Sequence, residues 1–285
     1  MKADLHLHSR CSDGSLKIEE LVLLAAGSGL DTISIADHDT TNGVSRAMEA
    51  GAKALIKIIP GLEISAFDPE TGAKVHILGY DYKLPAANIE ALCSPLLKRR
   101  DQNTLRQLKI IASFGYEISE AEVRAEAGES PALYKQHIMA VLIGKGYANA
   151  IYSDLYYKLF KGKGMASGDI EYVHYSDAIA AILADGGVPV LAHPGKPSNL
   201  KLIEKLEPLG LMGLELEHPH NNPADKTEIL QTAGRFGLML TGGSDFHGKY
   251  GSAAKLGEYR APESFYGSWK KLGRSLSKKT ALKIS

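Results

Sequence analysis

The chain has 285 residues, and its 33 Lys and Arg residues balance its 33 Asp and Glu residues. This length can bury a full core as one large domain or as a domain with an insertion. The balanced charge argues against long nucleic acid as an obligatory partner. No apolar run is long enough to cross a bilayer, and the N-terminus resembles a strand more than a signal peptide, so we expect no membrane partner. Cys11 and Cys93 match no CxxC spacing, which predicts reduced thiols in a cytoplasmic protein.

The first predicted strand covers residues 4–8, and its alternation puts Asp4, His6 and His8 on one face. A helix follows, for which Ser15 is a candidate cap, and its apolar stripe consists of Ile18, Leu21, Val22 and Ala25. Further strands are predicted at residues 32–36, 56–63, 75–80, 188–192, 213–217 and 238–242. The turn residues 68–72 predict that residues 64–67 and 73–80 pair as a hairpin.

Strand and helix patterns alternate at both ends of the chain, which predicts an α/β fold with a largely parallel sheet. Seven strands with polar candidates at most of their C-terminal ends indicate a barrel with its active face on one side. Residues 85–168 differ, because their pattern is helical and strand signals vanish. We therefore expect a barrel formed by residues 1–84 and 169–285, and a helical insertion at 85–168 that caps the ligand-bearing face. A basic stretch made of Lys270, Lys271, Arg274, Lys278 and Lys279 is interpreted as a solvated helix face.

Histidines and carboxylates recur at the ends of these strands. An isolated His-x-His pair is more often structural or exposed, but here further candidates follow at strand after strand. The set is His6, His8, Asp13, His38, Glu63, His76, His193, Asp245 and His247. Mixed imidazole and carboxylate ligands suit Zn²⁺, Mn²⁺ or Fe²⁺ better than Ca²⁺ or Mg²⁺. Nine such groups can serve two or three ions if a carboxylate such as Glu63 bridges two of them.

A cluster of this kind lowers the pKa of a bound water and neutralises phosphoryl oxygens during in-line attack. Ser–His–Asp, Cys–His, G-x-S-x-G and P-loop patterns are missing from the sequence, so covalent catalysis has no support. A centre of this kind can therefore hydrolyse a phosphate ester with metal-bound hydroxide. Asp37 is a candidate for orienting a ligand imidazole, Asp39 is interpreted as a turn residue, and His174 as structural.

Six segments together resemble the PHP (polymerase and histidinol phosphatase) family, in the TrpH/YciV-like phosphoesterase branch. They are residues 4–9 (DLHLHS), 12–14 (SDG), 36–40 (ADHDT), 60–63 (PGLE), 193–195 (HPG) and 243–247 (GSDFH). The resemblance implies a distorted (β/α)7 barrel with a trinuclear metal centre. One ion would be held by His6, His8, Glu63 and Asp245, a second by Asp13, His38 and His247, and a third by Glu63, His76 and His193. Of these residues, Asp13, His38, His193, Asp245 and His247 are the expected catalytic group.

The same branch is similar to enzymes that remove the 3′-phosphate from nucleoside 3′,5′-bisphosphates, leaving products such as AMP and phosphate. There an Arg and a His of the insertion meet the substrate phosphate, and this chain has Lys135 and His137 at those positions. Lysine supplies a point charge where arginine would supply a bidentate fork. Arg99 and Arg100 are further candidates for phosphate binding, with an exposed helix face as the alternative. His218 or His220 could contact phosphate or protonate a leaving oxygen, with a surface loop as the alternative.

We therefore expect a small phosphorylated substrate, in the first place a nucleotide. Alternatives are a 5′→3′ exonuclease on short RNA, a histidinol phosphate phosphatase and a non-catalytic metal-binding module.

Overall fold

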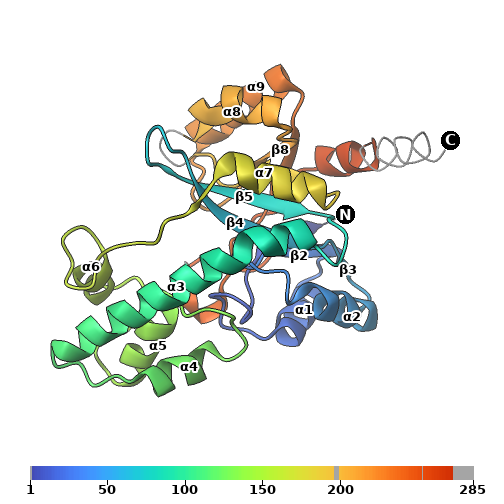
Figure 1. Cartoon of the computed structure of the whole chain (residues 1–285). Helices are drawn as coiled ribbons and strands as arrows, with labels where there is room; N and C mark the ends of the chain where they lie inside the picture. Colours follow the sequence, from blue (N-terminus) through green and yellow to red (C-terminus); the bar gives the residue numbers. More distant parts are fainter. Residues whose placement is uncertain (1, 196–198, 252, 272–285) are drawn as a thin grey trace.

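The computed structural model describes residues 2–195, 199–251 and 253–271 (Figure 1). Its strands form two sheets, and the main ones are β1 (Ala3–Leu7) and β2 (Thr32–Ile35) in the first, and β4 (Gly61–Phe67), β5 (Lys74–Tyr80), β7 (Val188–Leu191), β8 (Gly213–Glu217) and β9 (Met239–Gly242) in the second. The N–H of His8 donates to the Phe246 carbonyl after β9 at 2.9 Å, and the N–H of Glu63 donates to the Asp37 carbonyl after β2 at 3.2 Å. These two contacts join the sheets on both sides, as expected for a distorted seven-stranded barrel.

The strands are largely parallel, as predicted, and β5 is the exception. β5 is antiparallel to both neighbours, β4 and β7, whereas the pairs β1–β2, β7–β8 and β8–β9 are parallel. The expected strand at 56–63 is two strands, the short β3 (Lys57–Ile58) and β4, and the break includes Pro60, which lacks the N–H of a ladder. The predicted hairpin between β4 and β5 is confirmed. A second short strand, β6 (Val173–His174), pairs with the end of β4.

The helices of the barrel pack on the outside of the sheets. They are α1 (Ile18–Gly27), α2 (Val44–Ala54), α7 (Tyr175–Ala184), α8 (Ile203–Leu206) and α9 (Pro223–Phe236). The predicted stripe of α1 is buried. Its expected cap is wrong, because α1 begins after Lys17, whose N–H donates to Glu20, while the Ser15 hydroxyl accepts from the N–H of Lys249. Ser15 therefore fixes the segment after β9 instead of the helix.

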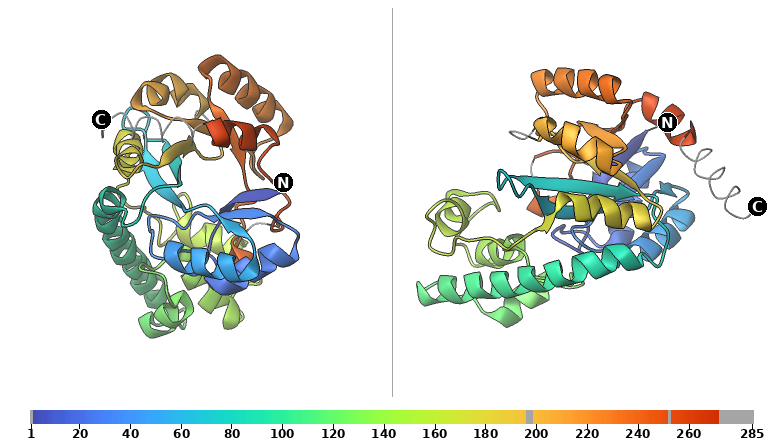
Figure 2. Two further views of the ribbon diagram at one scale, coloured as in Figure 1. Left: turned by 90° about the vertical axis from the view of Figure 1, so that its right-hand side faces the viewer. Right: turned by 45° about the horizontal axis from the view of Figure 1, so that its top comes forward.

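Between β5 and β7 the chain forms the helices α3 (Ala87–Ser113), α4 (Glu120–Ala127), α5 (Lys135–Gly144) and α6 (Asp154–Phe160). Figure 2 shows α3 running along the barrel and onward to the other three. Ile89 and Cys93 of α3 pack in the barrel core, whereas Leu108 and Ile111 belong to a second apolar core around Ile138. Because one continuous helix serves both cores, the division at residues 85 and 168 stays a prediction.

Three smaller expectations concern the thiols, the membrane and the basic stretch. Cys11 and Cys93 are buried and form no disulfide. Among the described residues, no helix combines the length and apolar character that crossing a bilayer requires. Lys270 and Lys271 are exposed, whereas Arg274, Lys278 and Lys279 lie outside the described residues.

Candidate metal centre

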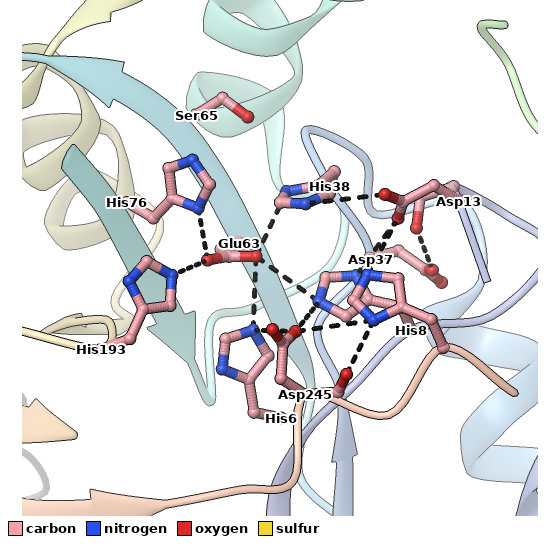
Figure 3. A network of polar contacts seen from close by, with 12 residues as sticks. His6, His8, Asp13, Asp37, His38, Glu63, Ser65, His76, His193 and Asp245 are labelled. Atoms are coloured by element: carbon pink, nitrogen blue, oxygen red, sulfur yellow. Dashed lines mark hydrogen bonds and ion pairs between the residues drawn. The ribbon is translucent and has the colours of Figure 1, made fainter. Parts of the chain in front are cut away.

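The nine candidate ligands meet at one rim of the barrel (Figure 3). Parallel strands bring their C-terminal ends to one rim, which places the residues in or after β1, β2, β4, β7 and β9 together. β5 runs the other way, so a residue near its beginning reaches the same rim. His76 is that residue, and it pairs with Ser65 on β4. The antiparallel direction of β5 thus explains how His76, near the start of its strand, reaches the rim where the candidates on the parallel strands lie.

The carboxylate of Glu63 lies at the centre of five imidazoles (Figure 3). Its Oε2 is 3.3 Å from His6 Nε2, 3.4 Å from His8 Nε2 and 3.2 Å from His38 Nδ1. Its Oε1 is 2.7 Å from His76 Nδ1 and 3.0 Å from His193 Nε2. Burial would raise the pKa of Glu63, but the imidazoles of His76, His38 and His6 outweigh it and hold that pKa well below its usual range. This geometry suits a carboxylate that bridges two cations.

Two aspartates complete the cluster on its other side. Asp245 Oδ1 lies 3.3 Å from His8 Nε2 and 3.6 Å from His6 Nε2. Asp13 Oδ1 lies 3.4 Å from His247 Nε2, and Asp13 Oδ2 lies 4.0 Å from His38 Nε2. Burial opposes ionisation of both carboxyls, yet the imidazoles around them, first that of His247, lower the pKa of each.

Hydrogen bonds to the second ring nitrogen show which imidazoles offer a lone pair to a metal. His6 Nδ1 donates to Glu215 Oε1 at 2.9 Å, and His247 Nδ1 donates to the Asp245 carbonyl at 2.7 Å. The neutral ring then has an unprotonated Nε2, the form that metal-binding histidines take. Within the described part of the chain, the buried atoms His6 Nε2, His8 Nε2 and Asp13 Oδ1 have no hydrogen-bond partner. Such atoms are costly to bury unless a cation meets them, so the donor set fits divalent metal ions.

Three other histidines have the opposite proton arrangement. The Nδ1 atoms of His137, His174 and His218 each accept a backbone N–H, from Tyr134, Ser176 and His220 respectively, at 3.0–3.1 Å. A backbone N–H is always a donor, so Nδ1 has no proton and a neutral ring carries its proton on Nε2. These rings are donors at Nε2, and they differ from the ligand candidates in this respect.

Two buried aspartates, Asp37 and Asp4, form hydrogen bonds with the loops that carry the candidate ligands Asp13 and Asp245. Asp37 accepts from the N–H and the hydroxyl of Ser9 and from the hydroxyl of Ser12, at 2.6–2.8 Å. Its hydrogen bonds therefore organise the loop that leads to Asp13, and the expectation that it orients an imidazole is wrong. Asp4 accepts from the N–H and hydroxyl of Ser244 at 2.9 and 2.6 Å, next to Asp245.

The sequence interpretation missed Glu215 and Gln136. Glu215 is fully buried, and besides His6 it accepts the backbone N–H of His193 at 2.8 Å. The sequence did contain a signal for Glu215, because an acidic residue in the middle of a buried strand needs a polar partner. Gln136 donates from Nε2 to Asp13 Oδ2 at 2.9 Å. No sequence signal pointed to Gln136, since its partner is 123 residues away.

Beside the cluster lies a cleft with a volume of about 310 Å³. Its wall contains Asp13, His38, His76 and His193, the tyrosines Tyr134, Tyr156 and Tyr172, and the cations Lys74, Arg100, Lys135 and Lys161. Burial lowers the pKa of Lys135 to about 8, and Asp169, whose Oδ2 is 3.9 Å from Lys135 Nζ, opposes that shift. The insertion thus supplies cationic side chains beside the ligand cluster.

Arg100 is fixed in this wall. It donates to Asp39 Oδ2 at 2.6 Å and to the Ser65 hydroxyl at 2.9 Å, and its guanidinium lies 4.9 Å from the ring centre of Tyr134. Its interpretation as an exposed helix face is therefore wrong. Asp39 has the left-handed φ of 58° that a tight turn requires, which confirms it as a turn residue.

The remaining candidates for substrate contact lie outside the cleft wall. His137 is 1% exposed, and His218 is fully buried, with Nε2 3.4 Å from Asp245 Oδ2. Arg99 donates to the Glu171 carbonyl at 2.9 Å, and His220 is exposed. The structure thus brings Lys135 and Arg100 together beside the cluster and places His137 and His218 away from the opening.

Comparison with known proteins agrees with the resemblance. A model of the PHP domain matches residues 4–187. A phosphoribosyl 1,2-cyclic phosphate 1,2-diphosphodiesterase of Eggerthella lenta is 42% identical over 263 residues, which cover 92% of this chain and 100% of the relative. A 3′,5′-nucleoside bisphosphate phosphatase of Chromobacterium violaceum is 28% identical and covers 86% of either chain.

A solved structure has the same fold over nearly the whole chain. A predicted metal-dependent phosphoesterase of Bifidobacterium adolescentis superposes with a TM-score of 0.86 at 30% identity, covering 93% of this chain and 94% of the other. The ligand cluster at the barrel rim agrees with these relationships. The chain therefore belongs to the PHP-domain family and is a metal-dependent phosphoesterase.

Proposed function

We propose that the enzyme hydrolyses a phosphate ester on a ribose that carries a second phosphate, with a cyclic 1,2-phosphodiester of phosphoribose as the first candidate. The names of the Eggerthella and Chromobacterium relatives share this substrate pattern, and the Eggerthella enzyme is the more similar of the two. The observation that carries the proposal is the position of the cationic cleft beside the cluster, because four candidate ligands, Asp13, His38, His76 and His193, form part of its wall.

We assign the ligands to three positions. His6, His8, Glu63 and Asp245 would hold one ion, Asp13, His38 and His247 a second, and Glu63, His76 and His193 a third. Mn²⁺, Fe²⁺ and Zn²⁺ suit this donor set. Ions of this kind polarise a phosphoryl oxygen and supply a hydrolytic nucleophile near neutral pH. Asp13, His38, His193, Asp245 and His247 are then the catalytic group, because they hold the ions that touch the reacting phosphate.

The cleft wall binds the second phosphate in this proposal. Lys74 and Lys135 lie near the carboxylate of Asp169, and Arg100 pairs with that of Asp39, so these three cations outnumber the two carboxylates beside them. A phosphate monoester carries close to two negative charges at neutral pH, which matches that surplus. Lys135 is a cleft residue supplied by the insertion, while Arg100 is held in place by Asp39 and Ser65. A single-phosphate substrate would leave this charge uncompensated.

A second candidate is the 3′-phosphate of a nucleoside 3′,5′-bisphosphate, with AMP and phosphate as the products from the adenosine compound. The three tyrosines in the cleft wall favour it, because a nucleobase stacks on aromatic rings. Both candidates place a second phosphate against the same wall and differ in what occupies the anomeric side of the ribose.

The test compares turnover of four substrates by protein reconstituted with Mn²⁺, Fe²⁺ or Zn²⁺. They are phosphoribosyl 1,2-cyclic phosphate, adenosine 3′,5′-bisphosphate, histidinol phosphate and a 5′-phosphorylated short RNA, with products followed by ³¹P NMR. We expect the highest kcat/KM on one of the first two substrates, and no turnover by the Glu63→Gln variant. Preference for histidinol phosphate or RNA would refute the proposed substrate class. Absence of turnover on all four with metal bound would favour a non-catalytic module.

A further inference from the structure

His218 lies behind the ligand cluster, in the segment after β8. Its ring is fully buried and packs between the rings of His6 and His193, at centroid distances of 5.7 and 5.0 Å. The segment is held rigidly, because Asn221 Nδ2 donates to the carbonyls of Glu215 and Leu216 at 3.0 Å each. The Oδ1 of Asn221 accepts from the N–H of Gly195, two residues beyond His193. The position of the His218 ring is thus built by the same loops that carry the ligands.

The proton of the neutral His218 ring sits on one defined nitrogen. The backbone N–H of His220 donates to His218 Nδ1 at 3.0 Å, so Nδ1 is the acceptor and Nε2 carries the hydrogen. Nε2 is buried and makes no hydrogen bond within the described ranges. Asp245 Oδ2 lies 3.4 Å from it, just beyond an ordinary N–H···O distance. A protonated Nε2 cannot ligate a metal ion, so this atom is a donor directed at a proposed ligand.

The two oxygens of Asp245 face different surroundings. Oδ1 faces the imidazoles of His6 and His8, at 3.6 and 3.3 Å, whereas Oδ2 faces His218. The backbone of Asp245 is in the left-handed region with φ of 52°, an unfavourable conformation for a residue other than glycine. The bonds from Ser244 to Asp4 hold that backbone, but they do not fix the rotation of the carboxylate.

We propose that His218 is a positioning residue for Asp245. Its Nε2–H engages Oδ2 and fixes the carboxylate so that Oδ1 alone is presented to the ion held by His6 and His8. This role rests on the proposed ligand assignment and replaces the direct substrate contact expected from the sequence. The proposed role follows from the position of the proton on Nε2 and from the proximity of Nε2 to Asp245 Oδ2. It requires no change in the charge of His218.

A pair of substitutions separates this role from a purely structural one. His218→Asn keeps an acceptor at the position of Nδ1 for the His220 N–H and removes the donor, whereas His218→Gln places an amide N–H near the position of Nε2. Loss of a group that orients a metal ligand weakens metal binding by about 10–100-fold. We expect that loss in His218→Asn, together with a matching fall in kcat at unchanged KM, and recovery to within about threefold of the wild type in His218→Gln.

The readout is the affinity for Mn²⁺ of the metal-depleted full chain, measured by electron paramagnetic resonance, alongside kcat and KM. His174→Asn is the matched control, because His174 also accepts a backbone N–H at Nδ1 but lies outside the cluster, and we expect it to bind Mn²⁺ as the wild type does. Wild-type Mn²⁺ affinity in His218→Asn, or equal losses in both His218 variants, would overturn the positioning role while leaving the phosphoesterase proposal intact. Failure of the wild type itself to bind Mn²⁺ would overturn both.

Discussion

Replacing Glu215 with glutamine tests how the centre orients its first histidine. Glu215 is fully buried and accepts two N–H groups, His6 Nδ1–H at Oε1 and the backbone N–H of His193 at Oε2. Glutamine has nearly the same shape but only one acceptor oxygen, so its NH₂ group must face one of these donors. One hydrogen bond is lost in either orientation. If the amide faces His6, the ring proton moves to Nε2, and His6 can no longer present that nitrogen to a metal.

The expected magnitude follows from these contacts. A hydrogen bond to a charged group stabilises by about 1.5–3 kcal/mol. Loss of a partner that orients a metal ligand lowers metal affinity by about 10–100-fold, and a tenfold change corresponds to about 1.4 kcal/mol. The two ranges agree, so we expect Glu215→Gln to weaken Mn²⁺ binding by one to two orders of magnitude.

The assay is a calorimetric titration of the metal-depleted variant with Mn²⁺, with thermal unfolding recorded before and after the metal is added. Glu217→Gln is the control, because it makes the same substitution on the same strand at a carboxylate that pairs with Lys226 at 2.6 Å. We expect the control to bind Mn²⁺ with wild-type affinity. If Glu215→Gln also retained that affinity and full activity, the orientation of His6 by Glu215 would have no part in metal binding.

Three further predictions concern the ion count, the cleft and the insertion. His193→Ala removes a ligand of the proposed third position, so elemental analysis should show one ion fewer per chain with the fold retained by circular dichroism; an unchanged ion count would contradict the assignment. Because the pKa of Lys135 is lowered to about 8, its charge is present below that pH and lost above it, so KM for a substrate with two phosphates should rise between pH 7 and 9. Lys135→Arg should flatten this rise, whereas an identical rise in that variant would exclude Lys135 as its origin. Gln136→Ala removes the bond to Asp13 Oδ2 and should weaken binding of one metal ion by about tenfold, as measured by chelator competition. An unchanged metal affinity in this variant would mean that the bond from the insertion does not influence the centre.

The sequence by itself identified the candidate ligands and the outline of the fold. Period-two alternation placed His6 and His8 on one face of a strand, and turn residues placed the β4–β5 hairpin correctly. These signals are local, because they depend on the side-chain period of a strand and on the backbone preferences of a few turn residues. The ordered set of histidine and carboxylate segments carried the family resemblance that the comparisons confirmed.

Only the tertiary structure decided which polar groups act on one another across long chain separations. Glu215 orients His6 across 209 residues, and Gln136 reaches Asp13 across 123. Sequence periodicity shows the face on which a residue lies, but it does not show which distant face lies opposite. The same limit applies to Asp37, which binds the Ser9 loop instead of an imidazole, and to His218, whose tautomer depends on a single backbone N–H. The sequence thus determined which candidate ligands are available, and the three-dimensional packing determined how they are held.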